Sequence, residues 1–196
     1  FRKQSIPVVL VNNYLDMDGL VCISADHYGG AVQATEYLCK LGHCKIGLLS
    51  GRFSPQVSEA RIEGFVKTLA KYDIPVDDRF IADIEPALED GEEIMTRMLR
   101  EVDRPTAFFC TNDTIATGAM KAVTRAGLRV PEDIAIIGFD DSYISRVVEP
   151  ELTTVRIDAA KMGCLAMQTL FDLIAGIPLD KAHIQIPTEL IVRGTA

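Results

Sequence analysis

The sequence predicts an α/β protein built on an open parallel sheet. Four short runs are almost entirely apolar and rich in β-branched residues, as expected for parallel strands that are covered on both faces. Between these runs lie longer segments whose apolar residues recur with helical spacing. Strand and helix therefore alternate along the 196 residues, which is the pattern of a parallel sheet with helical crossovers.

The predicted strands are short and apolar. They read IPVVLVN (6–12), KIGLLSG (45–51), TAFFCT (106–111) and IAIIGFD (134–140). Two more segments are extended but interrupt the alternation, at 149–158 and 184–195. We expect these two segments to carry the chain from one lobe to another and back.

Five amphipathic stripes predict the helices. The first stripe ends at Gly42, because glycine readily adopts the left-handed conformation that terminates a helix. The five stripes are Ala31, Ala34, Leu38 and Leu41; Ile62, Phe65, Val66 and Leu69; Ile94, Met98 and Leu99; Ile115, Ala119, Ala122 and Val123; and Ala159, Met162, Ala166, Leu170 and Leu173.

Composition indicates an ordinary globular protein, with 48% hydrophobic and 24% charged residues. No apolar run approaches the ~20 residues that a membrane span needs. The formal net charge of −8 argues that this segment by itself repels nucleic acid. The five cysteines form no C-x-x-C pair, so we expect reduced thiols and no zinc site.

Polar residues follow three of the predicted strands. Ligands of open α/β sheets bind at the carboxyl ends of the strands, so we expect these residues to share one rim. Carboxylates accept hydrogen bonds from hydroxyls, amides donate and accept, and arginine donates a rigid fork. The set therefore suits a small polyhydroxylated ligand, and it comprises Ser50, Arg52, Ser54, Asn112, Asp113, Asp140 and Asp141.

The adjacent acids Asp140 and Asp141 allow two interpretations. Paired carboxylates can perform acid–base chemistry, but adjacent side chains usually point apart. We expect Asp141 and Asp113 to cap the helices that follow them, whereas Asn112 and Asp140 end apolar strands without being needed as caps. The sequence contains no G-x-S-x-G, Walker or G-x-G-x-x-G motif, so we predict no catalytic residue, no cofactor and no enzyme activity.

Taken together, six motifs resemble the lactose/galactose-repressor (LacI/GalR) family. They are TEYLCKLGHCKIGLLSG, ARIEGF, RPTAFFCTNDTIATGAM, AGLRVPEDIAIIGFDDS, PELTTVRID and ELIVRGT, and the likeness extends from about Ile6 to the end. The resemblance implies a type I periplasmic-binding-protein-like fold, in which two Rossmann-like lobes with parallel sheets flank a ligand cleft. Residues 1–42 and 156–178 would form an incomplete N-terminal lobe, and 43–153 with 184–196 the C-terminal lobe.

The resemblance also implies a function. The chain would be the effector-binding and dimerisation domain of a cytoplasmic transcriptional regulator. Its effector would be a sugar or sugar derivative, with a nucleoside or purine as the second choice. A helix-turn-helix domain, absent from this chain, would bind operator DNA, and a homodimer would match the two-fold symmetry of operators. For the regulator we expect no membrane partner. The alternative is a periplasmic sugar-binding protein of a transporter, which has the same fold.

By that resemblance, the arginine of ARIEGF, the asparagine of TNDT and the first acid of GFDD bind the effector. Many family members carry an aromatic residue after the strand that here reads FIADIEP. This chain has Ile84 and Pro86 there, so ring stacking from this position is not expected. The full set of predicted effector-binding residues is Asp140, Asn112, Arg61, Ser54, Val57 and Tyr28.

Overall fold

The computed structural model describes residues 6–13, 15, 17, 20–177 and 182–196. Its contacts divide the chain into two compact units: a smaller unit of residues 1–26 and 157–188, and a larger unit of residues 27–156 and 189–196. The first boundary lies at Asp26 rather than near residue 43, because residues 27–40 form a helix that packs against the second helix of the larger unit. Each unit is described by itself.

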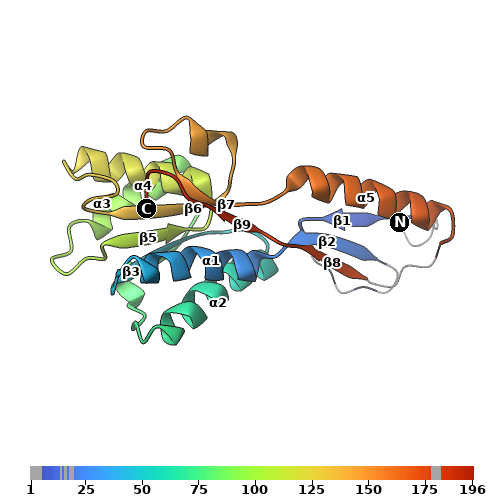
Figure 1. The fold of residues 1–196 in the computed structure, drawn as a ribbon, viewed down its shortest axis with the longest axis horizontal. Coiled ribbons are helices and arrows are strands. Elements are labelled where there is room, and N and C mark those ends of the chain that lie inside the picture. The colour runs from blue at the N-terminus through green and yellow to red at the C-terminus, as the bar shows by residue number, and fades with distance from the viewer. Residues whose placement is uncertain (1–5, 14, 16, 18–19, 178–181) are drawn as a thin grey trace. The chain divides into compact units, whose positions relative to one another are not determined.

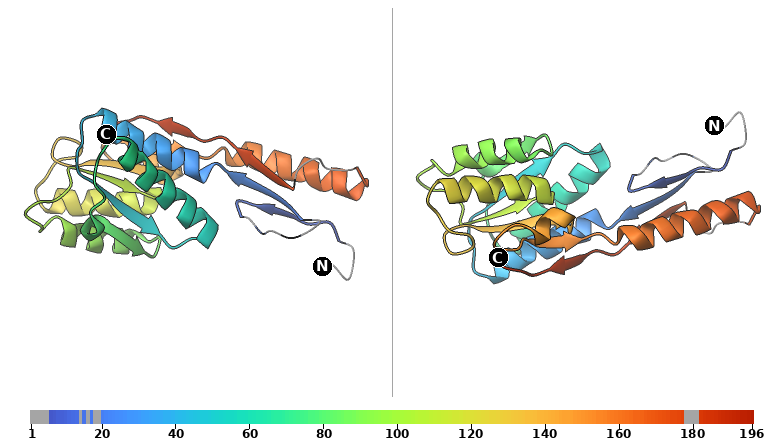
Figure 2. Two further views of the ribbon diagram at one scale, coloured as in Figure 1. Left: turned by 90° about the horizontal axis from the view of Figure 1, so that it is seen from below. Right: turned by 90° about the horizontal axis from the view of Figure 1, so that it is seen from above.

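The smaller unit is a three-stranded parallel sheet with one helix against it. The sheet order is β1 (Val9–Val11), β2 (Val21–Ala25) and β8 (His183–Ile186), and α5 (Ala159–Ile174) packs on β1 and β2 (Figure 2). Of the stripe predicted for α5, Met162 alone is buried, and it contacts Ile23 and Ile186. The resemblance ends this lobe at 178 and gives 184–196 to the other, whereas the smaller unit continues through β8 to Thr188. The segment between the two predicted bounds includes 179–181, which lie outside the described residues.

The larger unit contains a six-stranded sheet of order β4-β3-β5-β6-β7-β9. All neighbouring pairs are parallel except β7 and β9, which are antiparallel. The extended segments predicted at 149–158 and 184–195 supply β7 and β9. The strands are β3 (Ile46–Gly51), β4 (Ile81–Ile84), β5 (Ala107–Cys110), β6 (Ala135–Asp140), β7 (Thr153–Arg156) and β9 (Glu189–Ile191).

Helices cover both faces of this sheet (Figure 1). One pair is α1 (His27–Lys40) with α2 (Pro55–Lys71), and the other is α3 (Leu88–Met98) with α4 (Asp113–Arg125). Short 3₁₀ turns are η2 (Asp78–Phe80) and η3 (Tyr143–Arg146). Gly42 follows α1, as predicted, with φ of 90°, and Gly127 follows α4 in the same way with φ of 74°. Residues with a side chain rarely adopt this region.

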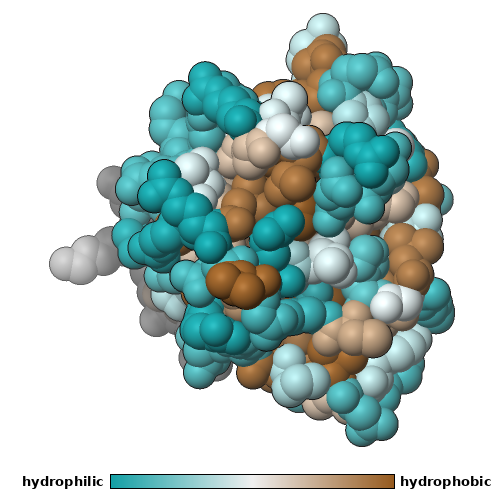
Figure 3. Space-filling model, turned by 90° about the vertical axis from the view of Figure 1, so that its left-hand side faces the viewer, coloured by the Kyte–Doolittle hydropathy of each residue, from teal (hydrophilic) through white to brown (hydrophobic). Residues whose placement is uncertain are grey.

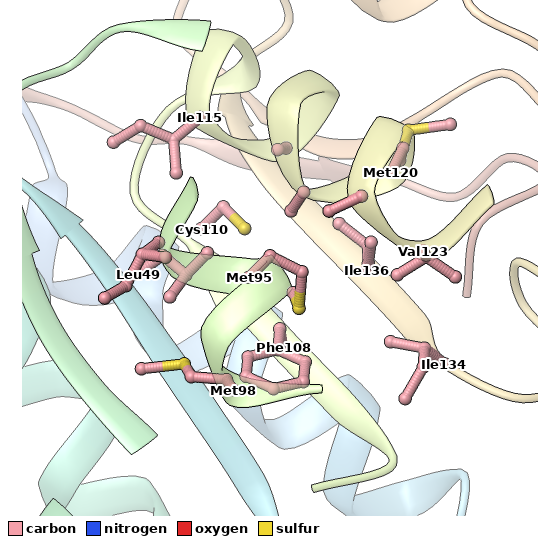
Figure 4. Packing of buried hydrophobic residues seen from close by; sticks show 14 of the residues in the cluster. Leu49, Met95, Met98, Phe108, Cys110, Ile115, Met120, Val123, Ile134 and Ile136 are labelled. Carbon is pink, nitrogen blue, oxygen red and sulfur yellow. The ribbon is translucent and has the colours of Figure 1, made fainter. Parts of the chain in front are cut away.

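The main core lies between the sheet and the α3–α4 pair (Figure 4). Leu49, Phe108 and Ile136 from the strands meet Met95 and Val123 from the helices, and all five are fully buried. On the α1–α2 face the ring of Phe109 on β5 packs against Phe139 on β6 and against Phe65 of α2. Leu41, which the predicted first stripe includes, is instead 50% exposed just after α1 ends.

The surface is mixed in polarity. In Figure 3, brown apolar patches on the face shown are interrupted by teal hydrophilic side chains. None of the helices within the described ranges combines the length and apolarity that a bilayer span requires.

Two glycines let α3 and α4 approach each other closely. A Cβ on Gly91 would lie 2.5 Å from the carbonyl oxygen of Ile115, and a Cβ on Gly118 would overlap the carbonyl oxygen of Leu88. Both obstacles are backbone atoms, which cannot rotate away as a side chain can. The lack of a side chain at these two positions therefore sets the distance between the helices.

We expect Gly118→Ala to lower the free energy of unfolding by about 1–3 kcal/mol, because the added methyl group overpacks the α3–α4 contact. Gly163 of α5 is a matched control, since a Cβ there meets nothing within 4 Å. Gly163→Ala should stabilise the helix by up to about 1 kcal/mol. Urea unfolding followed by circular dichroism measures both effects, and a Gly118→Ala protein as stable as the wild type would contradict the interpretation.

Candidate functional site

Three neighbouring strands of the larger unit end at one edge of its sheet. β3 ends at Gly51, β5 at Cys110 and β6 at Asp140, and these strands are adjacent and parallel. Their carboxyl ends therefore share an edge, as the sequence predicted. Arg61 reaches the same edge from α2, where it lies one turn after Val57 on the buried side of the helix.

The guanidinium group of Arg61 is at the centre of this edge. The side chain is 3% exposed, and its N–H groups donate to the backbone carbonyl oxygen of Thr111, to Nδ1 of His27 at 3.2 and 3.4 Å, and to Oδ1 of Asp140 at 3.3 Å. Its guanidinium carbon lies 3.8 Å from the ring centroid of Phe139. Burial lowers the pKa of Arg61 and the carboxylate of Asp140 opposes that change, and arginine stays protonated throughout the ordinary pH range.

Asp140 differs from Arg61 in that solvent reaches it. Its side chain is 37% exposed. Burial raises the pKa of this carboxyl to about 6 and the nearby charge of Asp113 adds to the rise, although Arg61 acts in the opposite direction. At neutral pH the carboxylate is thus ionised, paired with Arg61 on one side and open to a ligand on the other.

His27 is a neutral acceptor behind Arg61. It is the first residue of α1 and is 5% exposed. Burial, and then the charge of Arg61, lower its pKa to about 3, so the ring is uncharged and Nδ1 can accept a hydrogen bond from the guanidinium group. The sequence prediction of the site did not include His27, because nothing in the sequence around it indicates that it faces an arginine 34 residues away.

Two rings near Arg61 were also missed. Phe53 and Phe139 lie 5.0 and 3.8 Å from the guanidinium carbon, measured to their ring centroids, which is cation–π distance. One feature of the sequence does indicate that Arg61 is buried. Val57, Arg61 and Phe65 are spaced four residues apart, so the arginine sits in the apolar stripe of its helix and must be buried with partners.

The residue that caps α4 is Asn112, not Asp113 as predicted. The side-chain oxygen of Asn112 accepts a hydrogen bond from the backbone N–H of Ile115 at 2.8 Å, so Asn112 is the N-cap of α4. The buried carboxylate of Asp113 instead accepts hydrogen bonds from the backbone N–H of Ser142 at 2.7 Å and from the hydroxyl of Thr154. The prediction that Asp113 caps the helix is wrong, because Ser142, which precedes η3, and Thr154 of β7 satisfy its carboxylate.

Asp141 is not a helix cap either. Its side chain is 2% exposed, and its carboxylate accepts hydrogen bonds from Arg156 at 2.7 Å, from Arg146 at 3.1 Å and from Arg193. Burial alone would raise its pKa, but the hydrogen bonds from the three arginines outweigh burial and lower it to about 2. The predicted capping role is wrong because arginines from three separate segments occupy the carboxylate.

The other predicted residues lie at the starts of α1 and α2. Ser54 is the half-buried N-cap residue of α2, without a capping bond from its hydroxyl, and Val57 is buried on the Arg61 side of the helix. The ring of Tyr28 is 38% exposed and lies 5.8 Å from the Lys67 amine. Effector binding by these three residues stays a prediction.

The rim predicted from the strand ends is only partly formed. Ser50 is 1% exposed and so does not belong to it. Arg52 is exposed and pairs with Asp83 at 3.1 Å and Glu85 at 3.2 Å. Within the described residues, no group of three His, Cys, Asp or Glu side chains is placed to hold a metal ion.

Known proteins resemble the chain over nearly its whole length. Residues 35–196 match the periplasmic binding protein-like domain family. The chain is 35% identical over 191 residues to the HTH-type transcriptional repressor PurR of Pasteurella multocida (strain Pm70), an alignment that covers 96% of this chain and 57% of that protein. The chain thus spans little more than half the length of this curated relative.

Two solved structures are also similar. A regulatory protein of the LacI family from Chloroflexus aggregans superposes with a TM-score of 0.92 at 31% identity, covering 99% of this chain and 70% of that one. A LacI family transcriptional regulator from Enterococcus faecium with bound ribose has a TM-score of 0.91 at 27% identity, covering 99% and 72%.

The buried hydroxyl of Ser50 has no hydrogen-bond partner among the described residues. Leaving such a group unpaired costs about 1–3 kcal/mol, so Ser50→Ala should raise the free energy of unfolding by about 1 kcal/mol. The neighbouring hydroxyl of Thr111 accepts a hydrogen bond from the backbone N–H of Gly51 at 2.7 Å. Thr111→Val should therefore lower stability by about 1–2 kcal/mol. Urea unfolding compares the two variants, and destabilisation by Ser50→Ala would refute the assignment.

Proposed function

The chain belongs to the periplasmic binding protein-like domain family and, within it, to the LacI family of regulators, and on that basis we propose that it is the effector-binding part of a DNA-binding transcriptional repressor. The observation that supports a ligand site here is the Asp140 carboxylate, which is held by Arg61 at the end of β6 and still 37% exposed. A ligand that donates O–H or N–H groups can bind to the free lone pairs of that carboxylate.

The charges favour an uncharged effector. The positive charge of Arg61 is already paired with Asp140, and several of its N–H groups are taken by Thr111 and His27. His27 is neutral, and the buried carboxylate of Asp113 lies close enough to raise the pKa of Asp140. An anionic ligand would face an exposed carboxylate, whereas the hydroxyl groups of a sugar or sugar derivative would find acceptors. A nucleoside or purine, with its N–H donors, is the second choice.

Few contacts are needed for useful affinity. A hydrogen bond to a charged group contributes about 1.5–3 kcal/mol, and micromolar binding corresponds to about −8 kcal/mol. Three or four such bonds, with modest apolar contact, suffice. Asp140 supplies a charged acceptor, and the buried Arg61 holds that acceptor in place. The Asn112 amide can add a donor, because its cap bond to Ile115 uses only the side-chain oxygen.

A cytoplasmic regulator fits better than a periplasmic transport protein. The curated relative is named as a repressor, and its HTH-type description supports DNA binding through a module outside these residues. All five cysteines are free thiols, which suits a reducing compartment. Since operators are two-fold symmetric, we propose that the complete regulator acts as a homodimer.

A thermal-shift screen of pentoses, hexoses, their phosphates, nucleosides and purines tests this proposal. A true effector at a hundred times its dissociation constant should add about 2.7 kcal/mol of stability. Ribose, bound in the Enterococcus faecium regulator, is the first probe. We expect Asp140→Asn to weaken binding of the identified effector at least about tenfold, since the ionic acceptor is lost, as measured by calorimetry.

Asp83→Asn is the matched control for this variant. Asp83 is also an acid on a strand of the same sheet and also pairs with an arginine, but its side chain is 63% exposed. Binding should be unchanged in this variant. Equal affinities of the wild type and Asp140→Asn would overturn the proposed role of Asp140.

Effector binding should also depend on pH. The effector donates hydrogen bonds to the ionised carboxylate of Asp140, and burial raises the pKa of this group to about 6. Affinity should therefore fall as the pH drops through that value, by about tenfold between pH 7.5 and pH 5. Calorimetry at the two pH values measures the change, and Asp140→Asn should lack it. Affinity that rises or stays constant towards pH 5 would contradict the assignment.

A further inference from the structure

We propose that Asp141 is a positioning residue, whose bonds to Arg146, Arg156 and Arg193 hold the end of β6 so that Asp140 faces Arg61 and the ligand. We call these four residues the Asp141 clamp. This inference rests on the proposed function in one respect, namely that Asp140 binds the effector. All four residues of the clamp belong to the larger unit.

The clamp joins segments that are distant in sequence. Oδ2 of Asp141 accepts from Nε of Arg156 at 2.7 Å, and Oδ1 accepts from Arg193 and from the hydroxyl of Ser145 at 3.1 Å. Arg156 is the last residue of β7, and Arg193 lies just after β9. The carboxylate therefore ties the end of β6 to its neighbour β7 and to the segment that follows β9, the next strand beyond β7. Its near-complete burial contrasts with the exposure of Arg146 and Arg156, at 57% and 41%.

The backbone at this point needs such support. Asp140 and Asp141 have φ values of 110° and 51°, and both values are unfavourable for residues other than glycine. Conformations of this kind persist where the surroundings over-determine them. Asp113 adds a second restraint by accepting hydrogen bonds from the backbone N–H and hydroxyl of Ser142, at 2.7 and 2.9 Å.

The direction of the Asp140 side chain follows from these restraints. The Asp140 carboxylate bonds one charged partner, Arg61 of α2, at 3.3 Å. Among the described contacts, its side chain makes no hydrogen bond to β7 or β9. Once the clamp is loosened, the backbone can relax towards an ordinary conformation and the Asp140 carboxylate can turn towards water. Its desolvation, and with it the raised pKa, would then be lost.

The test is a carbon-13 carboxyl NMR titration of Asp140, assigned with Asp140→Asn. The charged groups that act on Asp140 are Arg61 of α2 and Asp113 of α4. His27 of α1 bonds Arg61, and Arg156 of β7 is the register partner of Asp140. The double variant Arg146→Gln/Arg156→Gln weakens the clamp and keeps the charge of Asp141. Removing positive charges by itself raises the pKa of a nearby acid, whereas release into water lowers it, so the sign of the shift separates the two effects.

We expect the midpoint of Asp140 to fall by about one pH unit in the double variant, towards its ordinary value. The matched control is Arg79→Gln/Arg129→Gln, which removes two exposed arginines that pair with Asp77 and Asp133 and should leave the midpoint unchanged. A midpoint that stays the same or rises in the folded clamp variant would overturn the proposal, and so would an equal fall in the control. Should the double variant not fold, Arg146→Gln carries the test alone.

The titration needs no ligand, so the two proposals can fail separately. A wild-type protein that binds no compound of the screen overturns the effector-binding function and leaves the titration result standing. An unchanged Asp140 midpoint beside normal effector binding overturns the positioning role alone.

Discussion

The buried guanidinium group of Arg61 is the constraint around which this edge of the larger unit is organised. An arginine that is almost fully removed from water must have its charge paired and its N–H groups bonded, because an uncompensated buried charge costs about 3–5 kcal/mol. The Asp140 carboxylate, the Thr111 carbonyl oxygen and the neutral His27 ring meet these requirements. Each comes from a different part of the chain, so satisfying one side chain brings β5, β6, α1 and α2 together.

The two adjacent acids at the end of β6 have different roles. Asp140 pairs with Arg61 and stays accessible to solvent, while Asp141 is buried among three arginines. The strained backbone lets neighbouring side chains point to different partners, at a cost of about 1–3 kcal/mol for each unfavourable residue. Burial shifts the pKa of both acids upwards. The partners of Asp141 reverse that shift, whereas those of Asp140 do not. Asp141 bonds three arginines and Asp140 only one, and the charge of Asp113 adds to the rise at Asp140.

Features that depend on local sequence were predicted more accurately than features that depend on contacts between distant residues. Most strands and the helices of the larger unit were predicted, because apolar periodicity reflects burial of each element separately. β4 was named only through the family resemblance. β2 was not predicted, since its sequence VCISA is short and holds small and polar residues, although it is buried throughout. At α4 the sequence prediction chose Asp113 as the cap, and that choice was wrong. Asn112 became the cap because the carboxylate of Asp113 found partners in Ser142 and Thr154, 29 and 41 residues away.

The amino-acid sequence by itself determined the α/β alternation, the placement of polar residues at strand ends and the family to which the chain belongs. These features depend on local pattern and on residue order. Tertiary structure alone decided that Arg61 would meet Asp140, 79 residues later, that His27 would serve as a neutral acceptor, and that Asp141 would bind three arginines instead of capping a helix. The physical reason is that sheet order and helix packing choose partners for a buried charge, and no local pattern encodes which distant group will arrive there.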